Sequence, residues 1–395
     1  MDALSELLNL RDDEKARRGL AHTPAEIAQQ PEKWLTTFAS FRRRLHEIAG
    51  FLSSAGLGAA SQPKPTVFLV GAGTSDYIGH ALSFLLRKQW QCEVLVVPST
   101  DLVTHVDEFL VPPRKTLWIW FSRSGDTPEG VAALEQVRKK CPDAWHLVIS
   151  CNTNGRMVRE SADQPRTLTI PLENAVNDRG LAMTSSFSSM VVLGQCLGSA
   201  GNLGGYEETL ARLVQAGKSF LPSAANLAAS LAQGPYTKAC FLGSGTLRAA
   251  ATESALKLVE LTAGRTLAFS ESPLGLRHGP MAALDQNTLV VSFLSGDLQV
   301  QRYELDLLEE IGSKKLVTTR VIVGARKIPD GAAFTEHQLA PSVPLDVADD
   351  YRSVVDVMFG QLLGLFFSLR WELRPDCPSP NGAISRVVQN VSIYA

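Results

Sequence analysis

The chain has 395 residues, which is more than one hydrophobic core usually organises, so we expect two domains. Hydrophobic residues make up 45% of the chain and charged residues 20%, a composition that excludes intrinsic disorder. With 38 basic and 40 acidic side chains, the formal net charge is −2, which excludes a general electrostatic attraction to nucleic acid. A small anionic ligand would have to be bound by a local site.

Six scattered cysteines form neither a C-x-x-C pair nor a zinc-binding pattern. We expect buried free thiols in a reducing compartment, and neither a metal nor another cofactor. The charged N-terminus has no apolar signal core. The apolar stretch 362–369 is too short to cross a bilayer and indicates a core helix. These features predict a cytoplasmic protein without a membrane partner.

Residues 1–62 are expected to form a helical segment. Apolar residues recur at helical spacing between Trp34 and Leu52, and the three arginines 42–44 lie on the polar side of that pattern. A proline-containing break at 61–65 then ends the helical segment.

Short apolar runs alternate with helical patterns after this break. Continuous apolar strands that alternate with helices indicate a parallel sheet covered on both faces. Ligands of such sheets bind at the carboxyl ends of the strands, and Gly, Ser and Thr residues follow these strands directly. The expected strands cover 66–70, 93–97, 117–121 and 145–150, and the expected helices cover 78–90 and 128–140.

The second half of the chain repeats the first. Gly243-Ser244-Gly245-Thr246 follows a strand and matches Gly71-Ala72-Gly73-Thr74 at an offset of 172. Ser295-Gly296-Asp297 follows a later strand and matches Ser124-Gly125-Asp126 at an offset of 171. Because the two offsets differ by one residue, we infer an internal duplication of a nested α/β domain. A helix at 203–232 is expected to link the copies.

The loop Ser122-Arg123-Ser124-Gly125-Asp126-Thr127 lies between an expected strand and an expected helix. It places three hydroxyl groups and several backbone N–H groups at a helix N-terminus, where the helix dipole attracts anions. The chain has no Walker motif, and Asp76 stands where a dinucleotide fingerprint has its third glycine. The loop therefore favours a phosphate group over a nucleotide.

Helix capping is the alternative interpretation of this loop, because Ser124 and Asp126 are both good capping residues. Capping accounts for one or two side chains, but more hydroxyl groups gather at the ends of the two neighbouring strands. These further hydroxyl groups belong to Thr74, Ser75, Ser122 and Thr127. We therefore interpret the whole set as a phosphate site.

The second copy of the loop has fewer hydroxyl groups. Leu298 replaces the threonine, and Leu294 follows the strand. We expect that this copy has lost the phosphate. The helix after the second glycine turn instead carries Glu253, Lys257 and Glu260, whose spacing places them on one face.

A solvated stripe of ion pairs is the alternative interpretation of this helix face. Two observations favour a site: the helix begins at the glycine turn where a ligand should lie, and His278 follows in a segment bounded by turn residues. A carboxylate, an amine and an imidazole together form a set suited to acid–base catalysis.

Four motifs occur here in the order found in the sugar isomerase (SIS) domain superfamily. They are G-x-G-T-S at 71–75, S-x-S-G-[DE]-T at 122–127, E-S-A-L-K-L-x-E at 253–260 and L-[RK]-H-G-P at 276–280. The chain resembles this superfamily over about 63–370. The resemblance implies an α/β fold with two tandem SIS domains, each a nested, flavodoxin-like parallel sheet of five strands flanked by helices. The expected parts are an N-terminal helical segment 1–62, a phosphate-binding SIS domain 63–215, a catalytic SIS domain 216–375 and a tail 376–395.

Within the superfamily the chain is similar to the isomerase half of glutamine:fructose-6-phosphate aminotransferase. That enzyme also has a glutaminase domain with an N-terminal cysteine, whereas this chain starts Met1-Asp2-Ala3, and Gln389 stands where the synthase has a substrate-binding lysine. The chain more closely resembles the tagatose-6-phosphate ketose/aldose isomerase group, whose members are also described as galactosamine-6-phosphate deaminases. The segment 177–187 and, more weakly, the tail 378–389 carry this resemblance.

The resemblance implies roles for individual residues. Thr74, Ser75, Ser122, Arg123, Ser124 and Thr127 match phosphate-binding positions, and Ser185 lies in the segment that lines the sugar. The synthases usually have glutamine in place of Arg123, so this arginine either adds charge at the phosphate or caps the loop.

The acid–base residues also match family positions. Glu260 matches the carboxylate that moves a proton between C1 and C2. His278 matches the histidine that opens the sugar ring, which in relatives reaches the active site from the partner subunit. Lys257 matches a lysine near the sugar hydroxyls, and Glu253 is expected to orient it. We expect a homodimer or higher homo-oligomer with its active site at the subunit interface.

The expected activity is that of an amino-sugar phosphate deaminase or isomerase without a metal or other cofactor. It would convert galactosamine 6-phosphate, or a related 6-phospho aldose, to the ketose 6-phosphate with release of ammonia. The alternative is a regulator that binds a sugar phosphate without turnover. Such regulators usually have an N-terminal helix-turn-helix, and residues 1–62 show no convincing turn between two short helices.

Overall fold

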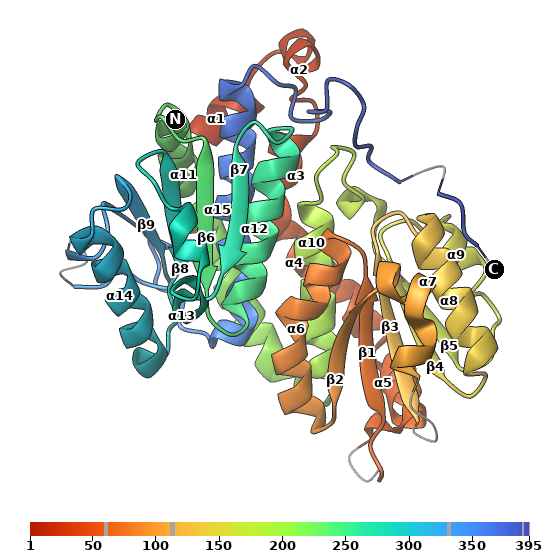
Figure 1. The fold of residues 1–395 in the computed structure, drawn as a ribbon. Coiled ribbons are helices and arrows are strands. Elements are labelled where there is room, and N and C mark those ends of the chain that lie inside the picture. The colour runs from red at the N-terminus through yellow and green to blue at the C-terminus, as the bar shows by residue number, and fades with distance from the viewer. Residues whose placement is uncertain (59–61, 111–114, 330–332, 389–390, 395) are drawn as a thin grey trace. The chain divides into compact units, whose positions relative to one another are not determined.

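The computed structural model describes residues 1–58, 62–110, 115–329, 333–388 and 391–394 (Figure 1). The chain forms two compact units, neither of which is continuous in sequence. Unit 1 comprises 1–32, 179–184 and 208–384, and unit 2 comprises 33–178, 185–207 and 385–395. Ser61 of the predicted break and Gln389 lie outside the described residues.

Helices cover the N-terminal segment, as predicted. Unit 1 contains the first three helices, and Glu26 on the third of them accepts a hydrogen bond from the backbone N–H of Gly180 at 3.3 Å. The N-terminal helices are α1 (Ala3–Leu8), α2 (Asp12–Arg18), α3 (Thr23–Ala28), α4 (Gln30–Arg43), α5 (Leu45–Leu52) and the π-helix η1 (Ser53–Leu57).

Unit 2 is built on a parallel sheet with the strand order β2-β1-β3-β4-β5. Its interior strand β1 is buried along its whole length, which explains the continuous apolar run in the sequence. The strands are β1 (Thr66–Gly71), β2 (Val94–Pro98), β3 (Thr116–Ser122), β4 (Trp145–Ser150) and β5 (Thr167–Pro171). The helices and 3-10 turns are α6 (Thr74–Trp90), α7 (Ser99–Phe109), α8 (Pro128–Lys140), α9 (Arg156–Arg159), η2 (Asn174–Val176), α10 (Ser185–Gly198) and η3 (Ala200–Asn202).

Aromatic side chains fill one side of the unit 2 sheet. Phe68 and Trp118 stack with their ring centroids 4.0 Å apart, and Trp120 lies 6.0 Å from Trp118. The Trp120 indole N–H donates to Nδ1 of His146 at 3.2 Å. Burial lowers the pKa of His146 to about 3, so its imidazole is a neutral part of the core.

Unit 1 is built on a second parallel sheet, with the strand order β10-β9-β8-β6-β7. Counted within its own sheet and read from the opposite edge, this order is 2-1-3-4-5, the same as in unit 2. The strands are β6 (Lys238–Gly243), β7 (Leu267–Glu271), β8 (Thr288–Phe293), β9 (Thr319–Val323) and β10 (His337–Leu339). The helices and the 3-10 turn are α11 (Leu203–Ala232), which begins in unit 2, α12 (Leu247–Leu261), α13 (Pro273–Leu276), η4 (Pro280–Ala283), α14 (Leu298–Ser313) and α15 (Asp349–Arg370).

The shared strand order confirms the predicted duplication of a flavodoxin-like sheet. In such sheets ligands bind where the strand order reverses, here between β1 and β3 in unit 2 and between β6 and β8 in unit 1. The glycine turns that follow β1 and β6 have the same conformation, because Gly73 and Gly245 both have φ of 55°. Each unit therefore has a pair of loops where its strand order reverses, after β1 and β3 in unit 2 and after β6 and β8 in unit 1.

Helix α15 is long and apolar enough to cross a membrane, but 94% of its most apolar window is buried in this structure. It packs closely against α12 because it has glycines at the contact. A Cβ at Gly360 would lie 2.1 Å from Ser254 Oγ, and one at Gly364 would lie 2.6 Å from a methyl group of Leu261. The core helix predicted from 362–369 is therefore confirmed.

The prediction that the thiols are buried is only partly correct. All six cysteines are free, and Cys151, Cys196 and Cys240 are buried. Cys92 and Cys141 are half-buried, and Cys377 is exposed because the chain leaves the core after α15.

Candidate active site

The loop Ser122–Thr127 joins β3 to α8 at the position where ligands of this fold bind. Thr74 and Ser75 form the first turn of α6, which follows the neighbouring strand β1. Two helix N-termini therefore start at the ends of adjacent strands, and each contributes partial positive charge. Most of the predicted phosphate-binding side chains are buried at this edge, namely those of Thr74, Ser75, Ser122, Arg123 and Ser124, whereas that of Thr127 is half-buried.

The loop is held in shape by its own serines. The Ser122 hydroxyl oxygen accepts from the N–H of Gly125 at 2.9 Å, and that of Ser124 accepts from the N–H of Asp126 at 3.2 Å. Asp126 accepts from the N–H of Arg156 at 2.8 Å, so it caps the short helix α9 instead of α8. Capping of α8 by Asp126 is therefore wrong as an interpretation, and each serine still has a hydroxyl proton to donate.

Arg123 lies against the C-terminal tail. Its guanidinium donates to the backbone carbonyl of Arg386. The guanidinium of Arg386 in turn donates to the carbonyl of Asp178 at 2.6 Å and to the side-chain oxygen of Asn177 at 2.6 Å. These contacts join Arg123 to the tail, and they test neither of the two roles expected for it, added charge at the phosphate and capping of the loop.

Ser185 is fully buried at the first residue of α10. The carboxylate of Asp178 accepts from the N–H groups of Ser185 at 3.1 Å and Ser186 at 2.9 Å, so it caps α10. Sequence reasoning missed Asp178 and Arg386 as positioning residues. The signal for Asp178 was present, because an acidic residue stands shortly before a serine-rich helix start.

Helix α12 carries the three charged residues that were predicted to share a face. The ammonium of Lys257 lies 3.4 Å from a carboxylate oxygen of Glu253 and is bonded to the carboxylate of Glu260. The side chains of Glu253 and Lys257 are fully buried, and that of Glu260 is 24% exposed. The interpretation as a solvated stripe is therefore wrong for Glu253 and Lys257.

Burial of this group has a chemical consequence. A buried charge requires a partner of opposite sign, and Lys257 has carboxylates on both sides. Glu260 alone of the three reaches the surface of the unit, in the last turn of α12. The arrangement leaves one carboxylate partly exposed while a buried ammonium lies beside it.

His278 is exposed on the turn between α13 and η4. The preceding Arg277 anchors this turn, with ion pairs to Glu310 at 2.7 Å and to Asp306 at 2.8 Å on α14. These carboxylates raise the pKa of Arg277. The imidazole of His278 is thus held at the surface of unit 1 on a fixed segment.

The predicted site residues fall into two sets. The loop residues, the start of α6 and Ser185 belong to unit 2, and the α12 residues and His278 belong to unit 1. The structure brings Glu253, Lys257 and Glu260 into contact. Among the described residues, no group of three or more His, Cys, Asp or Glu side chains is placed to hold a metal ion.

Comparisons with known proteins agree with this architecture. The SIS domain family matches residues 61–200. A Streptomyces coelicolor protein, provisionally named D-galactosamine-6-phosphate deaminase AgaS, is 37% identical over 383 residues, which cover 95% of each chain. The crystal structure of an Escherichia coli tagatose-6-phosphate ketose/aldose isomerase is 31% identical, with a TM-score of 0.84 over 94% of this chain and 96% of that one.

The resemblance to the aminotransferase is confirmed at the level of the fold. The C-terminal domain of the Francisella tularensis glucosamine-fructose-6-phosphate aminotransferase has a TM-score of 0.68 and 20% identity, over 88% of this chain and 96% of that one. The relatives with higher identity match almost end to end, over 94–96% of each chain. The chain therefore belongs to the family of SIS-domain proteins whose curated members are named D-galactosamine-6-phosphate deaminase AgaS.

Proposed function

We propose that the chain is an enzyme that converts galactosamine 6-phosphate to the ketose 6-phosphate and ammonia. The observation that carries this proposal is end-to-end identity of 37% with a deaminase-named relative, combined with a buried lysine between two carboxylates on α12. A protein that only bound the sugar would have no need for such a group at its ligand-facing helix.

The first SIS domain would anchor the substrate phosphate. The hydroxyl groups of Thr74, Ser75, Ser122, Ser124 and Thr127 and the N-termini of α6 and α8 supply donors of the kind that phosphate accepts. Arg123 would keep the tail in place through Arg386, and Asp178 would keep Ser185 in place. Support for this role comes from the buried, self-bonded loop, which needs little reordering to bind an anion.

The second SIS domain would carry out the chemistry. His278 would assist ring opening to the aldehyde, and Glu260 would take the C2 proton and deliver it to C1. The product is an imine at C2, which adds water and releases ammonia to leave the ketose. Lys257 would stabilise the developing negative charge near the sugar oxygens, and Glu253 would orient Lys257.

Plain aldose–ketose isomerisation is the second candidate activity. The name of the Escherichia coli structure supports it, because that protein is called a tagatose-6-phosphate ketose/aldose isomerase. The same proton transfer from C2 to C1 serves both reactions. Without an amine at C2 the intermediate is an enediol, and no ammonia is released.

We also propose that the enzyme is a homodimer or higher homo-oligomer and that a partner copy supplies His278 to each active site. Support comes from the exposure of His278 on an anchored turn. The free thiols are consistent with a cytoplasmic location. Size measurement by light scattering tests the assembly: an active monomer would contradict it.

The decisive experiment for the activity is an ammonia assay on purified protein with galactosamine 6-phosphate, run beside glucosamine 6-phosphate and tagatose 6-phosphate. We expect stoichiometric ammonia and ketose from galactosamine 6-phosphate. Aldose formation from tagatose 6-phosphate, without ammonia from either amino sugar, would favour the isomerase. Tight binding of all three sugars with neither product would establish a non-catalytic regulator.

A further inference from the structure

The loops of unit 1 that correspond to the phosphate site lie after β6 and β8. Gly245 and Thr246 follow β6, and Ser295 and Gly296 follow β8, at the same reversal of strand order that carries the phosphate loop in unit 2. The sheet order and the repeated sequence therefore identify this place as a second anion cradle, formed by Gly243–Thr246 and Leu294–Asp297.

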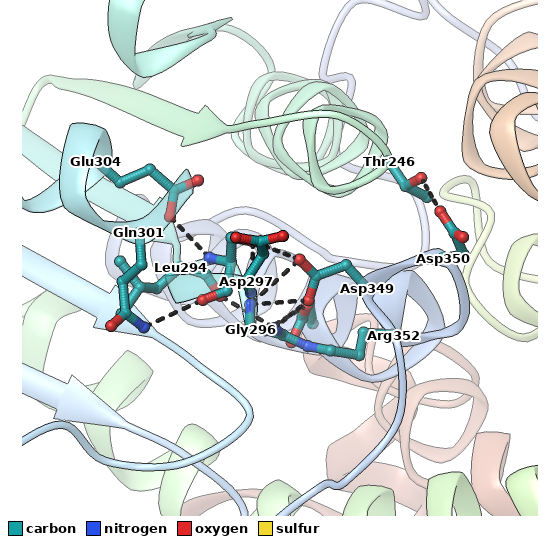
Figure 2. A network of polar contacts seen from close by, with 11 residues as sticks. Thr246, Leu294, Gly296, Asp297, Gln301, Glu304, Asp349, Asp350 and Arg352 are labelled. Atoms are coloured by element: carbon teal, nitrogen blue, oxygen red, sulfur yellow. Dashed lines mark hydrogen bonds and ion pairs between the residues drawn. The ribbon is translucent and has the colours of Figure 1, made fainter. Parts of the chain in front are cut away.

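A carboxylate of the chain itself already occupies this second cradle. The Ser295 hydroxyl donates to Asp349 at 2.6 Å, and the backbone N–H of Gly296 donates to the two oxygens of Asp349 at 3.0 and 3.2 Å. Figure 2 shows Asp349 at the start of α15 facing Gly296. The glycine eases this close approach, because a Cβ at Gly296 would lie 3.3 Å from the Asp349 carboxylate, which is a tight contact.

Neighbouring acidic residues take up the other donors of the cradle. The Thr246 hydroxyl donates to Asp350 at 3.0 Å (Figure 2). The backbone N–H of Ser295 donates to Glu304 at 2.7 Å. Thr246 and Ser295 are the counterparts of Thr74 and Ser124, so both halves of the cradle are satisfied internally.

A buried arginine completes the donor set around Asp349. Arg352 is fully buried and donates to Asp349 at 2.8 Å and to the carbonyl of Leu294 at 3.0 Å. It also lies 3.1 Å from Asp356. Hydroxyl, backbone N–H and guanidinium donors that converge on one point are the groups that bind phosphate in proteins. In this cradle they converge on a carboxylate.

We propose that Asp349 is a built-in substitute for phosphate: it closes the second cradle to ligands, and removal of its carboxylate would turn the cradle into a binding site for a free oxyanion. The carboxylate fixes the start of α15 to the β8 loop and so supports the helix that packs on α12 at Ser254 and Leu261. Unit 1 accordingly binds no phosphate in this cradle while Asp349 is in place. This inference depends only on the contacts within unit 1 and not on the proposed activity.

The test counts the inorganic phosphate ions bound per chain by calorimetry, with sulfate as a second oxyanion and chloride as the control at matched ionic strength. Asp349→Ala should bind one more phosphate per chain than the wild type, whether the wild type binds one or none. Asp349→Asn is the matched control, because its amide fills the same space and should leave the count unchanged.

Thermal unfolding gives a second readout. Phosphate at roughly ten to a hundred times its dissociation constant should raise the Tm of Asp349→Ala, relative to chloride, by about 3–10 °C more than it raises that of Asp349→Asn. If Asp349→Ala is unfolded in chloride, phosphate should restore part of the folded fraction. A folded Asp349→Ala with no added phosphate site, an unfolded one that phosphate does not rescue, or a wild type that binds two ions per chain would overturn the proposal.

Discussion

The two copies of the SIS fold differ in the hydrogen-bond partners of the loop that follows the third strand of each sheet, β3 in unit 2 and β8 in unit 1. In unit 2, serine hydroxyls accept bonds from the loop's own N–H groups, as Ser122 does from Gly125 at 2.9 Å. In unit 1, the corresponding N–H of Gly296 and the hydroxyl of Ser295 are bonded to the carboxylate of Asp349. One loop has its hydroxyl protons to offer to a ligand, and the other has an anion already in place.

The two duplicated loops have kept the same backbone framework, while the side chains that contact them have changed. Both loops keep a Ser-Gly-Asp core, and both sheets keep the same strand order. Replacement of Thr127 by Leu298 removes one hydroxyl, but the larger change is the arrival of Asp349 and Arg352 from α15. The helix that closes the second cradle also packs on α12, at Ser254 and Leu261.

The largest expected effect is on turnover, and it should leave sugar-phosphate affinity almost unchanged. Glu260→Gln removes the proposed base and should lower turnover by about 10²–10⁴-fold, with little change in sugar-phosphate affinity because the phosphate loop is untouched. Steady-state ammonia release and equilibrium binding measure the two quantities. Turnover within a few fold of the wild type would show that Glu260 is not the base.

The contact between α12 and α15 should be the most sensitive packing site. Gly360→Ala places a methyl group 2.1 Å from Ser254 Oγ and should destabilise unit 1 by about 2–4 kcal/mol. Gly50→Ala is the control, because nothing lies within 4 Å of a Cβ on that exposed helical glycine. Urea unfolding measures both, and equal stability of the two variants would contradict the close contact.

Matched serine variants test the difference between the loops directly. Ser124→Ala should raise KM about tenfold with kcat little changed, since a neutral donor to the phosphate is lost. Ser295→Ala should leave KM unchanged and cost about 1–2 kcal/mol of stability, because its hydroxyl donates to Asp349. A rise in KM for Ser295→Ala would mean that the second loop also contacts the substrate.

The two units should respond to pH in opposite directions. Burial lowers the pKa of His146 in unit 2 from 6.5 to about 3, so the unfolded state binds more protons between these values and stability falls as the pH is lowered. Burial raises the pKa of Asp356 in unit 1 from 3.8 to about 6, against the opposing effect of Arg352. Its contribution to stability is present below pH 3.8 and is lost as the pH rises through 6.

Variants isolate these two groups. His146→Gln should flatten the acid loss of stability, and Asp356→Asn should flatten the loss between pH 4 and 6, each slope being at most about 1.4 kcal/mol per pH unit. Urea titrations are followed by circular dichroism, which reports on both units, and by tryptophan fluorescence, which reports mainly on unit 2 because that unit holds the stacked Trp118 and Trp120. Unchanged slopes in both variants would contradict the assigned protonation states.

Local patterns predicted most of the fold. The helices at 128–140 and 203–232 have the predicted bounds, because a proline, a glycine or a change in periodicity marks their ends. The helix expected at 78–90 begins earlier, at Thr74, because the turn residues themselves form its first turn. The edge strands β5 and β7 had no signal, since their half-exposed residues interrupt the apolar run.

The parts of the site that lie within one sequence motif could be predicted, and the contacts between distant segments could not. The charged face of α12 follows from helical spacing, but the burial of Lys257 is a tertiary feature that helical spacing does not determine. Asp349 could not be connected to Ser295 from the sequence, because the contact spans 54 residues and follows no periodic pattern. The bond from Arg123 to Arg386 spans 263 residues and was missed for the same reason.

The central claim is that unit 2 alone holds the phosphate of the substrate and that unit 1 supplies the base. Calorimetric titration of Glu260→Gln with galactosamine 6-phosphate tests it most directly, because the substrate then binds without turnover. We predict one sugar per chain, with binding weakened about tenfold when Ser124→Ala is added and unchanged when Ser295→Ala is added. Two sugars per chain, or an affinity that depends on Ser295 and not on Ser124, would contradict the account.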